Sequence, residues 1–348
     1  MQATERPTPK ISKTAIWVAA ARAVGAREPD PSARNPDHLA ELLLGDPAAL
    51  SLEHPTVQAL TQSYDEAMKN AEVVGNVRFM TVRTRFIDAA LERAIADGAT
   101  QVVILGAGFD SHAYRFQELL ADVRVFEVDR PATQAFKRQR VDEALGGPPA
   151  NLTYAAIDFE REDLPGGLAR YGHDPSRRTF FIMEGLVMYL PEAAVRATLA
   201  FVASHAPGSS VVFDFFYTPM VEMIARLQTL DVPAAAKTSA NRFLSMIQGE
   251  PWLSGLPVGG EREHLRELGL TLREVLPVGG AESVKRYLTK ADGTQVGAQT
   301  LAGAMARMAD YFKSAGPGES TGPAQAFAER MREQQRTMVY QLADAVVP

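Results

Sequence analysis

The sequence predicts an α/β protein with a doubly wound, mostly parallel β-sheet, and three observations support this fold class. First, four apolar residues at 102–105 lead directly into Gly106-Ala107-Gly108, a pattern typical of a buried parallel strand that ends in a tight turn. Second, a similar strand at 123–129 ends in Asp129. Third, strand-like and helix-like segments alternate from there on, which implies parallel strands joined by right-handed crossovers.

The alternating segment contains apolar runs of strand length separated by helical patterns. The expected strands are 102–106, 123–129, 152–158, 179–184 and 210–216. The expected helices between them are 131–145, 164–171 and 191–205. Pro131 and Pro191 stand at the start of two of these helices, where proline is favoured. A helix at 260–268 and strands at 270–277 and 287–289 are expected to complete the sheet.

The same reading divides the chain into three parts. Residues 1–98 are predicted to form a helical N-terminal cap, with helices at 13–24, 38–44, 56–72 and 76–96. Residues 99–290 are predicted to form the α/β domain, with a helical insertion at about 218–250. Residues 291–348 are predicted to be a C-terminal helical extension, with helices at 297–314 and 323–346. This extension is a candidate for an arm that joins two copies of the chain in a homodimer.

Composition excludes several classes of function. The chain has 348 residues, 46% of them apolar, and a formal net charge of −6, which disfavours nucleic-acid or anionic-membrane binding. The absence of cysteine excludes disulfides, thiolate metal sites and a cysteine nucleophile. The six histidines lack the spacing of metal ligands, so no metal is expected. No run has the length of a membrane span or the form of a signal peptide, and we expect a cytoplasmic protein.

The glycine turn and the acidic strand end together indicate a nucleoside site. Glycines allow a ligand to approach the backbone closely, and the carboxylate of Asp129, or of its rival Glu127, suits the two ribose hydroxyls. The dinucleotide fingerprint has a third glycine where Ser111 stands. A nicotinamide-dependent oxidoreductase is therefore an alternative that this turn does not favour.

Five blocks of residues, in order, resemble the leucine carboxyl methyltransferase family, which includes bacterial and polyketide O-methyltransferases. The blocks are Arg83–Asp88, Leu105–Arg115, Phe126–Pro131, Ile157–Phe159 and Glu184–Pro191. The resemblance covers roughly residues 10–290. It implies a class I, Rossmann-like methyltransferase fold with a helical lead-in and a helical lid insertion. It also implies that the cofactor is S-adenosyl-L-methionine, with S-adenosyl-L-homocysteine as the product.

The resemblance also assigns a role to each candidate site residue. Gly106 and Gly108, with Asp110 in the same turn, are expected near the methionine part of the cofactor, and Asp129 or Glu127 at the ribose. Asp158 and Phe159 are expected to flank the adenine. Glu184 is expected near the amino group or the sulfonium. Arg83 is expected to bind a carboxylate, of the cofactor or of the substrate, and Tyr189 to reach the substrate carboxylate.

Two of these roles also follow from the chemistry of the residues. Glu184 ends the apolar run 179–183, and a carboxylate in such surroundings is unfavourable unless a cation pairs with it. Arg83 stands in a helix whose apolar side should face the sheet, and its planar guanidinium matches a carboxylate better than lysine does.

The acceptor group decides what else the enzyme needs. A carboxylate, with a pKa of about 4, is already ionised at neutral pH and needs only Arg83 or Tyr189 to hold it, whereas a phenol, with a pKa of about 10, gains from a base. His112 is the one candidate base in the matching blocks. The sequence therefore favours a carboxyl O-methyltransferase of secondary metabolism that acts on a small molecule. A hydroxyl O-methyltransferase and a non-catalytic cofactor-binding protein remain alternatives.

The helical insertion is expected to cover the acceptor, because its apolar and methionine-rich side chains suit an adaptable pocket. Those side chains are Met220, Met223, Ile224, Leu227, Leu230, Phe243, Leu244 and Met246.

Overall fold

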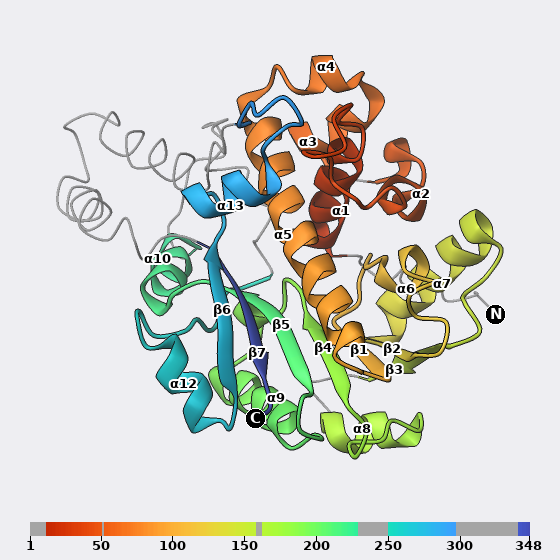
Figure 1. The fold of residues 1–348 in the computed structure, drawn as a ribbon. Coiled ribbons are helices and arrows are strands. Elements are labelled where there is room, and N and C mark those ends of the chain that lie inside the picture. The colour runs from red at the N-terminus through yellow and green to blue at the C-terminus, as the bar shows by residue number, and fades with distance from the viewer. Residues whose placement is uncertain (1–11, 51, 158–161, 229–249, 297–339) are drawn as a thin grey trace, which may run out of the picture.

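A computed structural model describes residues 12–50, 52–157, 162–228, 250–296 and 340–348, and its centre is a seven-stranded sheet between two layers of helices (Figure 1). The strands are β1 (Gln101–Leu105), β2 (Arg124–Asp129), β3 (Leu152–Ala156), β4 (Thr179–Met183), β5 (Ser210–Phe215), β6 (Thr271–Pro277) and β7 (Gln341–Val346). Their order is β3-β2-β1-β4-β5-β7-β6. Only β7 runs antiparallel to its neighbours, so the predicted doubly wound, mostly parallel sheet is confirmed.

The strand order reverses between β1 and β4. From β1 the chain builds outward through β2 and β3, then returns to place β4 on the other side of β1. In sheets with this strand order, the loops that follow the two central strands leave in opposite directions, and the region between them at the carboxyl edge, called the crevice below, is where ligands bind. Gly106 and Glu184 directly follow these two strands, so the sheet places both at the crevice.

The inner strands β1, β2, β4 and β5 are almost wholly buried on both faces, as their apolar composition predicts, whereas the edge strands β3 and β6 are partly exposed. Side chains alternate between the faces of a strand. Val102 and Ile104 of β1 accordingly belong to one core, which they share with α1 (Lys13–Gly25), α5 (Ala71–Ala96) and α7 (Pro131–Leu145). Val103 and Leu105 belong to a second core with α8 (Leu164–Arg170), α9 (Glu192–Ala203) and α12 (Glu261–Glu267).

The N-terminal cap is built around α5, the longest described helix. It starts at the N-cap Asn70, whose side chain accepts hydrogen bonds from the amides of Glu72 and Val73. In Figure 1 the cap helices gather around one half of α5, and its other half lies over the sheet, where it packs against β4 and β5. The other cap helices are α2 (Ala40–Leu44), α3 (Pro55–Gln58) and α4 (Tyr64–Ala67), with 3₁₀ turns at Pro47–Ala49 and Ala59–Thr61.

Three of the described helices remain. They are α6 (His112–Arg115), α10 (Thr218–Gln228) and α13 (Ala281–Tyr287), with a 3₁₀ turn at Val187–Tyr189. α10 begins the predicted insertion, but Met220 and Ile224 are buried in the first core rather than lining an open pocket. None of the helices in the described ranges is long and apolar enough to cross a membrane.

Three predicted elements are wrong. The helix expected at 56–72 is broken into α3, the Ala59–Thr61 turn and α4, and the strand expected at 287–289 is replaced by the end of α13 and a single bridge from Thr289 to Gln295. The helix expected at 323–346 is wrong for its last six residues, which form β7. Pairing with β5 and β6 buries these residues and overrides their local helical preference. The part of the insertion expected at 218–250 that follows α10, the helix expected at 297–314 and the rest of the helix expected at 323–346 lie almost wholly outside the described residues.

The position of β7 within the sheet can be tested through Leu342, which is fully buried in the first core. We expect Leu342→Ala to lower the free energy of unfolding by about 2–5 kcal/mol, because it removes core contacts and leaves a cavity. Val258 is 49% exposed, so Val258→Ala should change it by less than about 0.5 kcal/mol. Urea denaturation measures both variants, and equal effects would contradict the placement of β7.

Candidate functional site

The turn after β1 has the backbone that its glycines predict. Gly106 and Gly108 have φ angles of +67° and +41°, in the left-handed region that favours glycine. The amide of Gly106 donates to the carbonyl oxygen of Val128 at 2.8 Å, and the amide of Gly108 donates to Asp129 Oδ2 at 2.6 Å. The turn and the acid at the end of β2 are therefore in direct contact.

The two acids proposed for the ribose lie in different surroundings. Asp129 is half-buried at the end of β2, where burial raises its pKa although the amides of Gly108 and Arg130 donate to it. Glu127 is fully buried, and its Oε1 lies 2.8 Å from Lys137 Nζ. Burial raises the pKa of Glu127 to about 7 even though Lys137 opposes the shift. Of the two, only Asp129 contacts the glycine turn, while Glu127 is held in a core ion pair.

His112 is placed as a buried cation. Its Nδ1 lies 2.7 Å from Asp110 Oδ2 and its Nε2 lies 3.0 Å from Asp88 Oδ1. Burial acts to lower the pKa of His112, but Asp110 and Asp88 outweigh it and raise the pKa to about 9. In return the pKa of Asp110 is lowered, again against the effect of burial. A ring that holds both protons between two carboxylates is poorly suited to the base role predicted for His112.

Arg83 lies on the side of α5 that faces the sheet, with Ile87 and Ala90 one and two turns further along. Its Nη2 lies 2.5 Å from Glu184 Oε1 and its Nη1 lies 3.5 Å from Asp214 Oδ2. The guanidinium is 4% exposed, and its Nε is buried without a hydrogen-bond partner among the described residues. Arg83 therefore has a donor that a ligand could use.

A second arginine reaches the same carboxylate oxygen. Arg22 Nη1 lies 3.2 Å from Glu184 Oε1, and its Nη2 donates to the carbonyl oxygen of Phe109 at 2.7 Å. Its Nε lies 3.1 Å from Asp37 Oδ2. Arg22 thus ties α1 to both loops of the crevice, because Phe109 follows β1 and Glu184 follows β4.

These ion pairs form one buried network of alternating charge at the crevice. From one end to the other it contains Tyr340, Asp214, Arg83, Glu184, Arg22, Asp37, Arg115, Asp88, His112 and Asp110. Five members are acids and four are cations, so the described part of the network has an excess of one negative charge when all are ionised. A buried excess of negative charge favours a cationic ligand.

The network brings the loop after β1 and the end of β4 together, as the crevice predicts. One ligand-type atom from each of Asp110, His112 and Glu184 lies within 4.8 Å of the others. Such a trio resembles a metal site in composition, but a protonated His112 has no free lone pair for a metal. Each acid in the trio is already paired with a cation of the network.

Tyr189 lies in the 3₁₀ turn after β4 and is half-buried. Burial raises the pKa of its hydroxyl to about 12, while hydrogen bonds with the side chains of Thr14 and Trp252 act in the opposite direction. The structure thus places Tyr189 beside the start of α1. Asp158 and Phe159, predicted to flank the adenine, lie outside the described residues.

Six members of the network were not among the site residues predicted from the sequence: Arg22, Asp37, Asp88, Arg115, Asp214 and Tyr340. Arg22 interrupts the apolar run 15–24, and Asp214 interrupts the apolar strand 210–217. Both therefore carry the signal that identified Glu184, a charge in apolar surroundings. Tyr340 carries no such signal, because a tyrosine next to a strand is ordinary.

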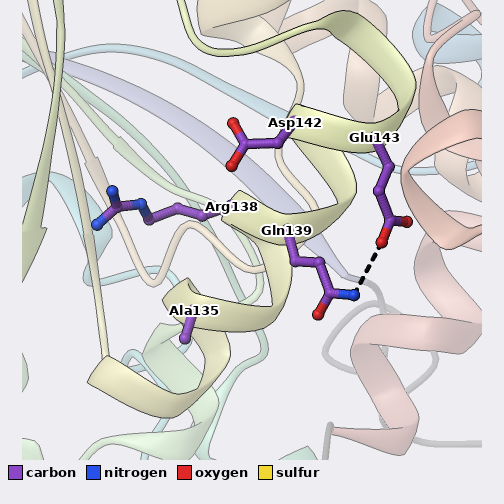
Figure 2. A pocket seen from close by; sticks show the side chains of 5 residues that line it. All are labelled: Ala135, Arg138, Gln139, Asp142 and Glu143. Atoms are coloured by element: carbon purple, nitrogen blue, oxygen red, sulfur yellow. Dashed lines mark hydrogen bonds between the residues drawn. The ribbon is translucent and has the colours of Figure 1, made fainter.

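A shallow surface hollow on α7 is not the functional site. It is lined by Ala135, Arg138, Gln139, Asp142 and Glu143, which all belong to this one helix (Figure 2). All five are exposed, and Gln139 and Glu143 hydrogen-bond to each other at 2.8 Å. Ligand sites in doubly wound sheets are instead formed at the carboxyl ends of strands.

Comparison with known proteins assigns the chain to a family. The profile of the family described as leucine carboxyl methyltransferase matches residues 15–203. This chain belongs to that family. A relative from Frankia alni, provisionally named an S-adenosyl-L-methionine-dependent methyltransferase, is 34% identical over 259 residues, which are 73% of this chain and 84% of the relative. A similarly named protein from Streptomyces avermitilis is 35% identical over 206 residues, which are 58% of this chain and 70% of that protein.

Solved structures resemble the chain more distantly. A provisionally named methyltransferase from Thermobifida fusca is 14% identical with a TM-score of 0.44, and the match covers 93% of this chain and 97% of the other. Family membership identifies this protein as an S-adenosylmethionine-dependent methyltransferase with the class I fold that its sequence predicts. The nicotinamide-dependent alternative is therefore discarded.

The charge assigned to His112 predicts how stability depends on pH. Its pKa of about 9 in the folded protein exceeds the unfolded value of 6.5, so its contribution is fully present below pH 6.5 and is lost as the pH rises through 9. We expect this loss to reach about 3 kcal/mol in the free energy of unfolding. Urea denaturation from pH 6.5 to 9.5 should show it in the wild-type protein and not in His112→Gln.

His205 provides the control for this measurement. It is also buried, but burial lowers its pKa, so it is neutral throughout the same pH range. His205→Gln should keep the pH dependence of the wild-type protein. An unchanged pH dependence in His112→Gln would contradict the assignment of His112 as a buried cation.

Proposed function

We propose that this methyltransferase transfers the methyl group to a carboxylate oxygen of a small molecule, as in natural-product biosynthesis. One observation carries the proposal: Arg83 is a buried cation beside Glu184 whose Nε–H has no hydrogen-bond partner among the described residues, while His112 lies as a cation between two acids. Arg83 thus offers a hydrogen-bond donor to an anion although the network as a whole is negative, and the acids on either side of His112 favour its protonated form. A carboxylate acceptor needs the first feature and does not need a base.

The described residues fit S-adenosylmethionine in three respects. The turn at Gly108 has no atom closer than 3.8 Å to the place where a Cβ would stand, so a ligand can approach the backbone there. The carboxylate of Asp129 stands beside this turn. The negative excess of the network suits a ligand that carries a sulfonium and an ammonium group.

S-adenosylmethionine, when bound, would supply an electrophilic methyl group for the acceptor oxygen, with a neutral thioether as the leaving group. The protein's part is to align the acceptor with that methyl group and to exclude water. We assign Glu184 and Asp129 to holding the cofactor, at its cationic groups and at its ribose. We assign Arg83 to a carboxylate, either that of the acceptor or that of the cofactor.

The assignment of Arg83 predicts the effect of a conservative substitution. We expect Arg83→Lys to lower kcat/KM by roughly tenfold to a hundredfold, because a single ammonium cannot replace the planar guanidinium that faces Glu184 and Asp214. The assay is run at saturating S-adenosylmethionine, so that a defect in binding the acceptor is separated from one in binding the cofactor.

Arg85 provides a matched control on the same helix. Its guanidinium donates to backbone carbonyl oxygens of the cap, at Arg34 and Pro31, rather than to the network. Arg85→Lys should keep the wild-type rate within about threefold, as expected for an arginine whose loss removes no buried charge pair. Equal effects at positions 83 and 85 would count against the role of Arg83.

The assignment of Asp129 predicts weaker cofactor binding without unfolding. We expect Asp129→Ala to reduce the free energy of S-adenosylhomocysteine binding by about 1–3 kcal/mol, the value of a hydrogen bond to a charged group. Asp142→Ala, in the exposed hollow of α7, should leave binding unchanged. Isothermal titration calorimetry measures both, and wild-type affinity in Asp129→Ala would refute the assignment.

A further inference from the structure

Tyr340 links the C-terminal strand to the crevice. It immediately precedes β7 and is 3% exposed. Its ring packs against Phe79 of α5 and Phe216, which follows β5, with centroid distances of 4.7 Å in both cases. The two aromatic neighbours therefore fix the position of the ring independently of its hydroxyl group.

The hydroxyl of Tyr340 bridges a cation and an acid. Arg83 Nη1 donates to the hydroxyl oxygen at 3.1 Å, and the hydroxyl also hydrogen-bonds to Asp214. Arginine has no acceptor, so the tyrosine oxygen accepts from Arg83 and its O–H donates to Asp214. Burial and the neighbouring Asp214 raise the pKa of this hydroxyl well above its ordinary value, so the O–H proton is retained.

Asp214 extends this bridge to the turn that carries Glu184. Its two carboxylate oxygens both lie 2.9 Å from the amide of Gly185, which donates to them. Asp214 lies two residues after Val212 in β5 and therefore points to the same face of the sheet, toward α5. Tyr340, Asp214 and Arg83 thus connect β7, β5 and α5 at the point where Glu184 leaves β4.

We propose that Tyr340 is a positioning residue for methyl transfer, whose hydroxyl orients Arg83 and Asp214 and thereby sets how Arg83 faces Glu184 and a bound carboxylate. This inference rests on the proposed function of the same site. It concerns a residue that acts through Arg83, because the described contacts of the hydroxyl are to Arg83 and Asp214.

Removal of the hydroxyl should make ligand binding sensitive to pH near neutrality. Asp214 is faced by Arg83 from α5, by Glu184 and the Gly185 amide after β4, and by Tyr340 before β7. Burial raises the pKa of Asp214 to about 6, and Arg83 and the tyrosine hydroxyl oppose a larger rise. Without the hydroxyl the pKa of Asp214 rises further, so Asp214 is protonated at higher pH and no longer pairs with Arg83.

The test is Tyr340→Phe, which keeps the ring and deletes only the hydroxyl. We measure the affinity for S-adenosylhomocysteine by isothermal titration calorimetry and compare the variant with the wild-type protein at each pH. We expect the variant to bind roughly tenfold more weakly at pH 7, with a larger loss of affinity at pH 6 and a smaller loss at pH 8.5. Asp214→Asn provides a second variant without the titrating group. Its affinity should be reduced but should not vary between pH 6 and pH 8.5 beyond the variation caused by the ligand's own amino group.

Tyr64→Phe is a closely matched control. The Tyr64 hydroxyl also bridges an arginine and an acid, at 3.3 Å from Arg78 Nη2 and 2.5 Å from Glu28 Oε2, but it does so in the N-terminal cap. Tyr64→Phe should bind the ligand as the wild-type protein does at every pH. If Tyr64→Phe loses as much affinity for S-adenosylhomocysteine as Tyr340→Phe does, the effect is due to general destabilisation and the inference is overturned.

Two further outcomes separate this inference from the function on which it rests. If the wild-type protein binds S-adenosylhomocysteine and Tyr340→Phe binds it equally well from pH 6 to pH 8.5, the positioning role is refuted and the proposed function stands. If the wild-type protein itself does not bind at any pH, the proposed function fails and the role of Tyr340 fails with it.

Discussion

The site depends on one carboxylate, that of Glu184, which is shared by two buried arginines. Arg22 comes from α1 in the N-terminal cap and Arg83 from α5, and both reach the same oxygen, at 3.2 Å and 2.5 Å. A carboxylate at the end of a buried strand is unfavourable without such partners, and a buried guanidinium is unfavourable without a carboxylate. The charges therefore require one another, and their pairing joins the cap to the carboxyl edge of the sheet.

The same pairing explains why the chain needs its cap. The loops after β1 and β4 meet at the crevice, and the segment 184–191 after β4 carries Glu184 without any basic residue of its own. The arginines that compensate Glu184 come from the helical segment before β1. Asp37 and Asp88 of the cap in turn meet Arg115 and His112 of the loop after β1. Ion pairs of both senses thus join the two parts: cap arginines pair with an acid of the α/β domain, and cap acids pair with cations of the α/β domain.

Sequence reasoning predicted the features that depend on local pattern. The parallel strands follow from apolar runs, and the contact between the glycine turn and Asp129 follows from strand order. It did not predict β7, because Gln341–Val346 becomes a strand only through its pairing with β5 and β6. It also treated His112 as a free imidazole, because a sequence does not show that Asp88 of a distant helix approaches its second nitrogen. Long-range pairing of charges is the part that the sequence did not reveal.

The central claim is that the acceptor is a carboxylate, and the chemistry of the product tests it most directly. The enzyme is incubated with methyl-labelled S-adenosylmethionine and matched panels of small carboxylic acids and phenols, and the labelled products are treated with mild alkali. A carboxylate acceptor gives a methyl ester, so we predict that alkali releases the label as methanol. Label that appears only on phenols and resists alkali would identify a methyl ether and contradict the account.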